Sequence, residues 1–340
     1  MRGWARKRAG KGFTYVDADG HRLPAADIER IKSLAIPPAW EDVWICPVPN
    51  GHLQAVGTDA AGRRQYLYHP DWRIRRDEAK FRRVTAAATR LPTARRRVAA
   101  DLGAQGMPLE RAAAIAVRLL DLGYFRIGND AYADANGSFG LTTLQRQHVR
   151  RKGSTLVFQF VGKSGIEHTI AIADADIVEA IRVLRQRRSA SDRLLAYQVD
   201  RAWSDLDAAA VNAYLSDVMG GELTAKDFRT WHATVLAAAA LAASAEPGDT
   251  AASRKRAVKA AVEEVAGYLG NTPTIAKNSY IDPRVLDRYE AGAVIDAATL
   301  PLAALLAIGA PMDKARSCLL SGGDDYELLF SAAPDARVSL

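Results

Sequence analysis

The sequence has 340 residues, 49% of them apolar, and a formal net charge of +7, which is the profile of a globular chain with room for two domains of roughly 100 to 200 residues each. Its two cysteines, Cys46 and Cys318, lie far apart and no signal-like segment begins the chain, which excludes a disulfide-rich secreted scaffold and predicts a reducing, intracellular compartment. The most apolar stretch, residues 235–245, is shorter than the roughly 20 residues that cross a bilayer core, so we expect no membrane span and no membrane partner.

Short apolar runs separated by turn residues fill the first 85 residues. Runs at such regular spacing are typical of a small β-sheet. The expected elements are strands over Phe13–Val16, Val43–Cys46, Leu53–Val56 and Gln65–Tyr68 and a helix over Ile28–Leu34. After Asp71 the pattern changes to Arg- and Ala-rich helical periodicity, which predicts a domain boundary near residue 85.

The chain beyond this boundary is predicted to be mainly helical, with a β-hairpin in its middle. Thr155–Val161 and Ile166–Ala173 alternate apolar and polar residues around a Gly-rich turn, as paired strands do. Helices are expected over Pro108–Leu122, Asp176–Arg187, Asp207–Met219, from Thr224 to a break at 246–249, and over Ala251–Leu269. The sequence therefore predicts an α+β fold, with a small β-rich lobe over residues 1–85 and a larger, mainly helical lobe that carries a small sheet over residues 86–292.

The positive charge is concentrated in the part of the chain before residue 293. Residues 1–292 carry 43 basic and 33 acidic groups, whereas residues 293–340 carry 3 and 6, and arginine outnumbers lysine 35 to 11. A guanidinium pairs two phosphate oxygens at once. Charge alone leaves two explanations open, a polyanionic partner such as nucleic acid or an Arg-rich composition without a binding role.

No pattern for a metal or a nucleotide loop is found. The six histidines lack the paired spacing of a zinc site; they are His21, His52, His69, His148, His168 and His232. Gly162-Lys163-Ser164 is not a phosphate-binding loop, because Val157 occupies the first glycine position and the segment joins two predicted strands. We therefore expect neither a metal nor a cofactor.

Five cationic or phenolic residues lie near predicted turns and helix starts. Arg126 follows the helix that ends near Leu122, Lys163 lies at the hairpin tip, Lys226 and Arg229 lie early in the next helix, and Tyr280 lies in a polar stretch. Each alone has an ordinary structural explanation, such as a cap, a solvated tip or packing. Together they provide what phosphoryl transfer to a phenol needs: guanidiniums for the phosphate oxygens, an ammonium to protonate a leaving alkoxide, and a phenol to attack.

Six segments that include these residues resemble the type IB DNA topoisomerases, most closely the short poxvirus-like bacterial members. The segments, which span roughly residues 10 to 290, are Ile36–Trp40, Gly62–His69, Phe125–Asn129, Phe160–Lys163, Thr224–Thr230 and Ser279–Arg284. The resemblance implies an enzyme that relaxes supercoiled duplex DNA by transient cleavage of one strand, strand rotation and religation, without ATP or metal.

The resemblance also implies a role for each residue. Tyr280 would form the 3′-phosphotyrosyl link, Arg126 and Arg229 would clamp the phosphate, and Lys163 would protonate the departing 5′ oxygen. Lys226 would assist at the same phosphate.

A C-shaped clamp around double-stranded DNA is the implied architecture. In such a clamp Gln65, Tyr66 and Tyr68 of the β-rich lobe would contact DNA, since an aromatic strand with basic neighbours suits that role. The alternative for this strand is the edge of a sheet core, and only one of its faces can be buried. Encirclement by one clamp implies a monomer, acting in the cytoplasm at the nucleoid.

One position departs from the family pattern. Many members have a histidine where this sequence has Asn271, in Gly270-Asn271-Thr272-Pro273. The resemblance implies that the Asn271 amide keeps the role by donating a hydrogen bond without a charge. The alternative is that Asn271 only caps a helix.

Three other functions are alternatives to this one. A tyrosine recombinase usually has histidine at the position of Lys226, and it has no counterpart of the two N-terminal motifs. A catalytically silent DNA-binding module would lack one of the active-site groups. A small-molecule kinase rests only on Ser321–Phe330, which resembles part of thiamine-monophosphate kinase, and we expect residues 293–340 to be a foreign, non-functional fragment.

Overall fold

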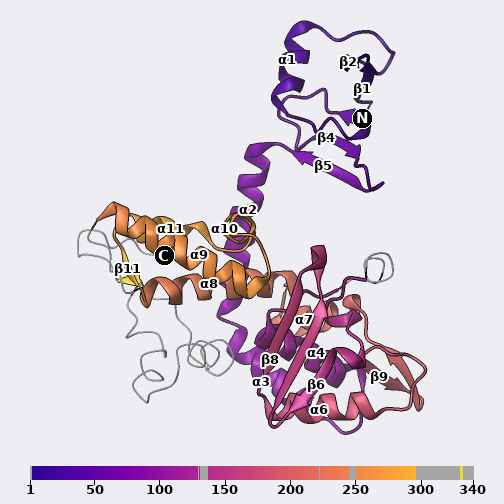
Figure 1. Cartoon of the computed structure of the whole chain (residues 1–340), viewed down its shortest axis with the longest axis vertical. Helices are drawn as coiled ribbons and strands as arrows, with labels where there is room; N and C mark the ends of the chain where they lie inside the picture. The colour runs from indigo at the N-terminus through magenta and orange to yellow at the C-terminus, as the bar shows by residue number, and fades with distance from the viewer. Residues whose placement is uncertain are drawn as a thin grey trace. The chain divides into compact units, whose positions relative to one another are not determined.

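The computed structural model describes residues 2–128, 130, 137–221, 223–244, 250–295 and 330–331, and it separates into one unit over residues 1–80 and another from residue 81 onward (Figure 1). The first unit is β-rich and the second is dominated by helices. This confirms the predicted combination of a β-rich N-terminal region with a mainly helical body. Helix α2 (Pro70–Ala88) contains both the observed division and the predicted boundary near residue 85.

The first unit is an antiparallel sheet with one helix. The strand order is β2-β1-β3-β4-β5, and the bounds are β1 (Trp4–Ala9), β2 (Gly12–Val16), β3 (Glu41–Ile45), β4 (Leu53–Thr58) and β5 (Arg64–Tyr68), with α1 over Ala25–Ser33. Its core contains Leu23, Ile31, Val43, Ile45 and Ala55. All four predicted strands and the predicted helix are confirmed.

Strand β1 was not predicted, because its sequence has no apolar run. Its Arg6 has a structural role, donating a hydrogen bond of 3.0 Å to the Pro37 carbonyl. The guanidinium also lies 4.2 Å from the centre of the Phe13 ring. A charged residue therefore fixes part of the segment Ile36–Trp40 against the sheet.

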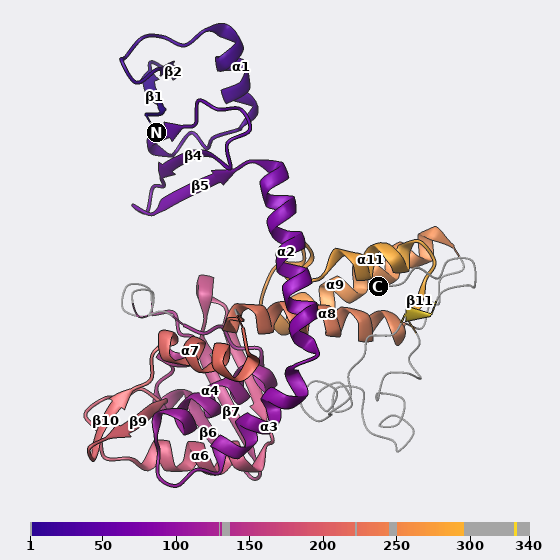
Figure 2. The same ribbon diagram turned by 180° about the vertical axis from the view of Figure 1, so that it is seen from behind.

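The second unit packs its helices around one apolar core. Its helices are α3 (Leu91–Leu102), α4 (Leu109–Gly123), α6 (Ala175–Gln186), α7 (Ala208–Met219), α8 (Ala225–Ala242), α9 (Ala251–Leu269), α10 (Pro273–Ser279) and α11 (Pro283–Glu290). Helix α4 contacts α3, α6, α7 and α8, and α9 contacts α8, α10 and α11 (Figure 2). Five predicted helices are confirmed: α4, α6 and α7 lie within about one residue of the predicted bounds, α9 has the predicted bounds, and α8 ends at Ala242, before the predicted break at 246–249.

A three-stranded antiparallel sheet accompanies these helices. The order is β6 (Val149–Lys152), β7 (Thr155–Val161) and β8 (Glu167–Ile172), so the predicted hairpin is confirmed as β7 and β8. Short 3₁₀ turns cover Leu141–Thr143, Arg146–His148 and Lys163–Gly165. The small pairs β9 (Ala196–Val199) with β10 (Ala202–Asp205), and β11 (Val294–Ile295) with β12 (Phe330–Ser331), were not predicted as pairs.

Helix α8 begins at a capping box. The Asp227 carboxylate accepts hydrogen bonds from the backbone N–H (3.0 Å) and the hydroxyl (2.8 Å) of Thr224. Arg83 of α2 donates to the same carboxylate at 2.8 Å. Asp227 is buried, so this cap both starts α8 and joins it to α2.

Two further expectations concern the kinase-like segment and membrane spans. The segment compared with thiamine-monophosphate kinase lies outside the described residues apart from the backbone of Phe330 and Ser331. No described helix combines the length and apolar character that crossing a bilayer requires.

A buried ion pair joins the helices of the second unit. Asp121 of α4 accepts hydrogen bonds from Arg95 Nε (2.8 Å) and Nη2 (2.9 Å), and its carboxylate lies 3.3 Å from Nε2 of the fully buried His232 of α8. Burial alone would raise the pKa of Asp121, but the charge of Arg95 and the nearby His232 outweigh it, so the pKa lies well below its ordinary value. Removing the carboxylate charge would take this buried counter-charge away from the Arg95 guanidinium.

We expect Asp121→Asn to lower the free energy of unfolding by about 3 to 5 kcal/mol, because one partner of a buried pair is removed. For a domain of this size the melting temperature should fall by about 10 °C, measured by circular dichroism. The control is Glu179→Gln, since Glu179 pairs with Arg182 on the exposed face of α6. That change should leave the melting temperature almost unchanged, because an exposed ion pair contributes little to stability. Equal shifts for the two variants would contradict a structural role for the buried pair.

Candidate active site

Arg126 reaches the site because helix α4 ends at a left-handed residue. Tyr124 has φ 55°, which turns the chain out of the helix and buries Phe125 in the core. The half-buried Arg126 then donates through Nη2 to the carbonyl of Gly270 (3.0 Å) and to Oδ1 of Asn271. The segment after α4 is thereby joined to the turn after α9.

Arg229 comes to the same place from the second turn of α8. Its side chain is only 4% exposed. Nη1 donates to the carbonyl of Tyr124, and Nη2 donates to the carbonyl of Leu269 at 2.8 Å. One guanidinium therefore holds the C-terminal ends of α4 and α9 against α8.

Asn271 combines a cap with a side-chain contact. Gly270 ends α9 in the left-handed region (φ 58°), and the Asn271 backbone N–H donates to the Ala266 carbonyl at 3.0 Å. This is a Schellman cap, and it uses only the backbone of Asn271. The side-chain oxygen accepts from Arg126, so capping does not account for the amide.

Tyr280 follows α10 and lies beside Arg229. The centre of its ring is 5.3 Å from the Arg229 guanidinium carbon. Its backbone N–H donates to the Ala276 carbonyl at 3.1 Å. Thr234 of α8 fixes the next turn, because its hydroxyl accepts from the Asp282 N–H at 3.1 Å. Helices α4, α8, α9 and α10 thus place four of the predicted residues together (Figure 1).

The site is electropositive. Burial, followed by the charge of Arg126, lowers the pKa of Arg229 to about 10, while Tyr280 acts in the opposite direction. Burial also lowers the pKa of Arg126. Within the described ranges neither guanidinium pairs with a carboxylate. Two cations held close together without a counter-ion favour binding of an anion with several oxygens.

Two polar groups in the site have unsatisfied hydrogen-bonding capacity. Arg229 Nε and Asn271 Nδ2 are buried, and neither has a partner among the residues that the structure describes. Buried donors are normally paired, so an unpaired donor needs an explanation. One belongs to the Arg229 cation and the other to the amide that accepts from Arg126, and an anion bound there would supply the missing acceptor.

Lys163 does not join this cluster. It is exposed at the tip of the β7–β8 hairpin, where Ser164 (φ 64°) and Gly165 (φ 74°) make the turn. Its ammonium makes no hydrogen bond or ion pair with any described residue. Lys226 is also exposed, one helical turn before Arg229 on α8.

The three predicted contact residues of the first unit lie on β5. Gln65 Nε2 donates to Asp59 at 2.9 Å, so its side chain is already engaged. Tyr66 is 51% exposed and stacks on Tyr68 at 6.3 Å. Leu67 packs against the core, which puts the two tyrosines on the opposite face, as strand alternation predicts.

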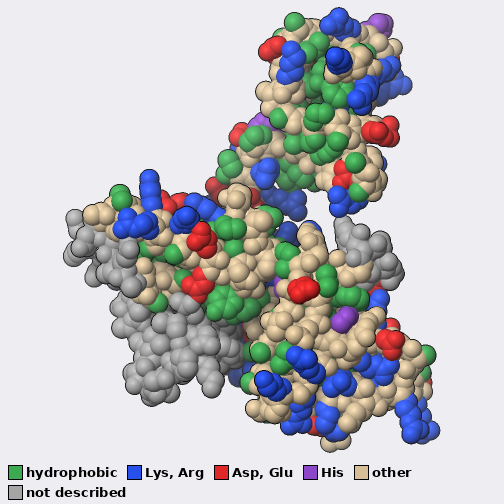
Figure 3. All heavy atoms as spheres, in the orientation of Figure 1, with side chains coloured by type: hydrophobic (Ala, Val, Ile, Leu, Met, Phe, Trp, Pro, Cys, Tyr) green, Lys and Arg blue, Asp and Glu red, His purple; other side chains and the backbone are tan. Residues whose placement is uncertain are grey.

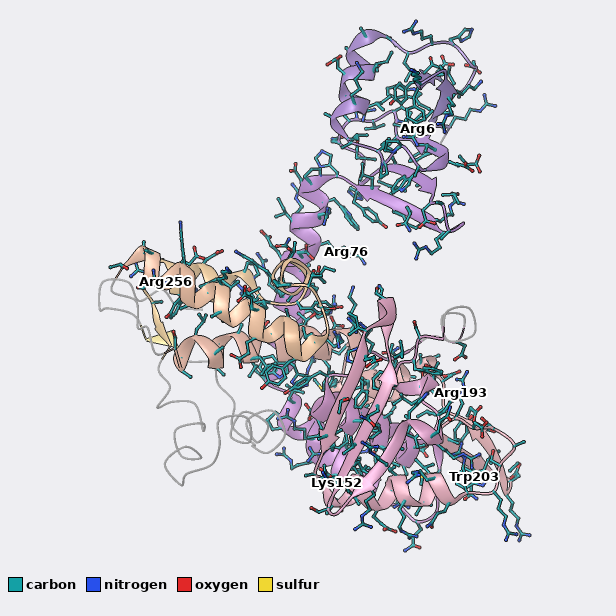
Figure 4. The ribbon with its side chains drawn as sticks, viewed as in Figure 1. Arg6, Arg76, Lys152, Arg193, Trp203 and Arg256 are labelled. Carbon is teal, nitrogen blue, oxygen red and sulfur yellow. The ribbon has the colours of Figure 1, made fainter. Side chains whose placement is uncertain are left out.

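The sequence reasoning missed residues that extend or support these groups. Tyr68 stacks on Trp72 at 4.4 Å, and Arg76, labelled in Figure 4, lies 5.0 Å from the Trp72 ring. The spacing of four between Trp72 and Arg76 was a usable signal, because both residues lie on α2, whereas Tyr68 ends strand β5. His168 was considered only as a metal ligand, although the hairpin register sets it opposite Phe160, beside the Lys163 turn.

One acidic cluster in the described part of the chain has the spacing of a metal site. Asp17, Asp19 and His21 place ligand atoms within 4.8 Å of one another on the surface of the first unit. The Asp17 carboxylate accepts from the backbone N–H groups of Asp19 (2.9 Å) and His21 (2.8 Å). The cluster is therefore explained by an Asx turn.

Comparisons with known proteins place these features in a family. Residues 69–294 match the model of the catalytic core of eukaryotic DNA topoisomerase I, and residues 12–59 match the N-terminal domain of bacterial DNA topoisomerase IB. DNA topoisomerase 1B of Acanthamoeba polyphaga mimivirus is 29% identical over 299 residues, covering 85% of this chain and 88% of the viral protein. DNA topoisomerase 1B of Vaccinia virus (strain Copenhagen) is 22% identical, with 68% and 71% covered. Arabidopsis thaliana DNA topoisomerase 1 beta is 28% identical over 50% of this chain and 18% of the plant protein.

The contacts of Arg229 and Lys163 predict that replacing the first lowers stability and that replacing the second does not. Arg229→Ala leaves two helix-end carbonyls without their donors, at about 1 to 3 kcal/mol each if they stay buried. Its melting temperature should fall by about 5 °C or more. Lys163→Ala removes a solvated side chain and should stay within about 2 °C of the parent. A large loss for Lys163→Ala, or none for Arg229→Ala, would contradict the contacts described.

Proposed function

Because the chain belongs to the DNA topoisomerase I family and is a type IB DNA topoisomerase, we propose that Tyr280 is the residue that attacks DNA. The family assignment rests on a match across 69–294, together with the N-terminal match. It sets aside the recombinase, the silent binding module and the small-molecule kinase. What remains to be assigned is the part that each residue plays.

The proposed reaction exchanges one phosphodiester for another. The Tyr280 oxygen attacks a backbone phosphorus, the bond from phosphorus to the 5′ oxygen breaks, and a 3′-phosphotyrosyl link forms. The departing 5′ oxygen takes a proton, and the phenol loses one. Because the new link has an energy similar to that of the old one, the freed 5′ hydroxyl can reverse the step after strand rotation, and no ATP is needed.

Arg126, Arg229 and Asn271 are proposed to hold the non-bridging phosphate oxygens. The observation that supports this most directly is the pair of guanidiniums without a carboxylate, accompanied by the unpaired Arg229 Nε and Asn271 Nδ2, next to a phenol. Preorganised donors stabilise a pentacoordinate transition state because they are already oriented when its charge develops. Asn271 contributes a hydrogen bond where many relatives use histidine.

Lys163 is proposed as the general acid for the 5′ oxygen, with Lys226 as a further contact to the same phosphate. An ammonium at a hairpin tip without partners of its own is available to a bound strand. The geometry of the free protein need not be productive, since catalytic contacts often tighten only in the complex.

DNA binding is proposed to use both parts of the chain. Residues 1–85 would form the DNA-binding lobe, with Gln65, Tyr66 and Tyr68 as contacts, and residues 86–292 the catalytic lobe. Lys and Arg side chains are spread over the faces of the units seen in Figure 3. We propose that the two lobes close around duplex DNA as a C-shaped clamp, and that one monomer acts at the nucleoid in the cytoplasm.

The activity is tested by incubating the protein with negatively supercoiled plasmid in EDTA without ATP. Relaxation to a ladder of topoisomers is the expected result. The control omits the protein. A requirement for ATP or Mg²⁺ would contradict the proposed chemistry.

Tyr280→Phe tests the nucleophile. It removes the attacking oxygen and keeps the ring beside Arg229, so DNA binding measured by fluorescence anisotropy should change little. Relaxation and the covalent complex trapped by detergent should both be lost. A covalent complex formed by this variant would exclude Tyr280.

Lys163→Ala tests the acid. The cleavage rate of the variant on an ordinary substrate should be lower than that of the parent by a factor of about 10² to 10⁴. A substrate with a 5′-bridging sulfur should restore most of the rate, because a thiolate leaves without a proton. Equal losses on the two substrates would make Lys163 a phosphate contact only.

Asn271→Ala tests the uncharged donor. Single-turnover cleavage should slow by about 10², as for other transition-state donors. Asn271→His should remain active, because it also provides an N–H. Parent-like cleavage by Asn271→Ala would show that the cap is its whole function.

A further inference from the structure

His168 lies between the two turns that carry Lys163 and Asn271. It is on β8, paired with Phe160 of β7, and its half-buried ring stacks on the Phe160 ring at 5.1 Å and 21°. A small pocket beside it is lined by Arg126, Phe139, Phe160, Gly162 and Arg229, among others. No step of the proposed mechanism uses this residue.

The imidazole fills the space left by two glycines. A Cβ on Gly162 would lie 2.6 Å from His168 Cδ2, and a Cβ on Gly270 would lie 2.4 Å from His168 Cε1. Gly162 directly precedes Lys163. Gly270 directly precedes Asn271, and its carbonyl accepts from Arg126. One ring therefore packs against both backbones.

Space, rather than backbone conformation, makes Gly162 necessary. Its φ of −97° and ψ of −165° are open to any residue. The turn that follows is closed by the N–H of Gly162 to the Ile166 carbonyl (2.7 Å) and of Gly165 to the Gly162 carbonyl (3.2 Å). These bonds shape the tip, but they do not tie it to α9, whereas the imidazole contacts both.

The surroundings favour a neutral ring. Burial, and then the charges of Arg126 and Arg229, lower the pKa of His168 below its ordinary value. Neither ring nitrogen is hydrogen-bonded to another group in the described ranges. The shape of the ring, not its charge, is what the two glycines contact.

We propose that His168 is a positioning residue, which sets the hairpin carrying Lys163 against the turn carrying Asn271. The proposal rests on Lys163 being the acid. The proposed role is to fix position: without the ring, the exposed ammonium is no longer held at the correct distance from the phosphate that Arg126 and Asn271 are proposed to bind. Misplacement by about 1 Å is enough to cost about 10²-fold in rate.

The test compares single-turnover cleavage of an ordinary and a 5′-bridging-thiolate substrate. His168→Ala should slow the ordinary reaction by about 10- to 100-fold and the thiolate reaction much less, because the defect lies in proton delivery. His168→Phe keeps the stack and fills the space, so it should restore most of the rate. Gly162→Ala pushes on the ring from the other side and should reproduce the thiolate-selective defect. Lys163→Ala with His168→Ala should be no slower than Lys163→Ala alone.

His148→Ala is the matched control. His148 is a half-buried histidine whose ring packs against Phe139, with ring centres 4.3 Å apart and planes inclined by 60°, and it is not one of the groups that crowd either glycine. Any loss of cleavage rate in His148→Ala should be equal on the two substrates. Melting temperatures of all variants separate misfolding from mispositioning.

Three results would overturn the proposal. If His168→Ala lost the same cleavage rate on both substrates while the thiolate substrate still rescued Lys163→Ala, the positioning role of His168 would be rejected and Lys163 would remain the acid. Loss in His168→Phe as large as in His168→Ala would assign the ring nitrogens a direct role. If Lys163→Ala were not rescued either, the acid assignment itself would be wrong and the inference would fall with it.

Discussion

Two guanidiniums, one buried and one half-buried, are held by carbonyl oxygens and pair with none of the described carboxylates, and the rest of the site depends on this constraint. The acceptors come from the ends of helices: Tyr124 after α4, and Leu269 and Gly270 at the end of α9. The C-terminal end of a helix carries a partial negative charge, because its last carbonyls are unpaired. Such acceptors orient a guanidinium without cancelling its charge. A carboxylate would satisfy the same donors but would compete with the phosphate.

This arrangement explains why the helices end where they do. Tyr124 takes a left-handed conformation that is rare for a large residue, and this frees its carbonyl for Arg229. Gly270 ends α9 at the residue before Asn271. The Asp121 carboxylate, one turn before Tyr124, pairs instead with Arg95, so the acid of this region is already engaged. The free protein keeps two like charges together, and an anion bound at the proposed site would relieve that unfavourable contact. Strain of this kind is typical of binding sites, which trade stability for function.

The elements were largely predictable from the sequence, and the exceptions have physical causes. Periodicity and turn residues identified α9 and β7 with their observed bounds because their patterns are local. Strand β1 was missed because charged side chains occupy half of it, and Arg6 makes contacts that no local pattern reveals. The pair of β9 and β10 is too short to produce a clear alternation. Residues 293–340 remain a prediction from resemblance.

The site residues were named from motifs, but their arrangement was not predictable. The contact between Arg229 and the Tyr124 carbonyl joins residues 105 positions apart, and that between Arg126 and Asn271 joins residues 145 apart. No periodicity specifies such pairs. The sequence left two interpretations of Asn271, a helix cap and a polar side chain in the site. In the structure its backbone forms the cap and its side chain contacts Arg126. His168 was overlooked because a histidine was judged by metal spacing and not by the space around it.

The account is tested most directly by locating the covalent bond. The protein is incubated with supercoiled plasmid, quenched with detergent, digested with nuclease and protease, and examined by tandem mass spectrometry. The account predicts a nucleotide attached through its 3′ phosphate to the phenol oxygen of Tyr280, in the peptide that follows α10. Attachment to another tyrosine, attachment through a 5′ phosphate, or relaxation without any covalent adduct would contradict it.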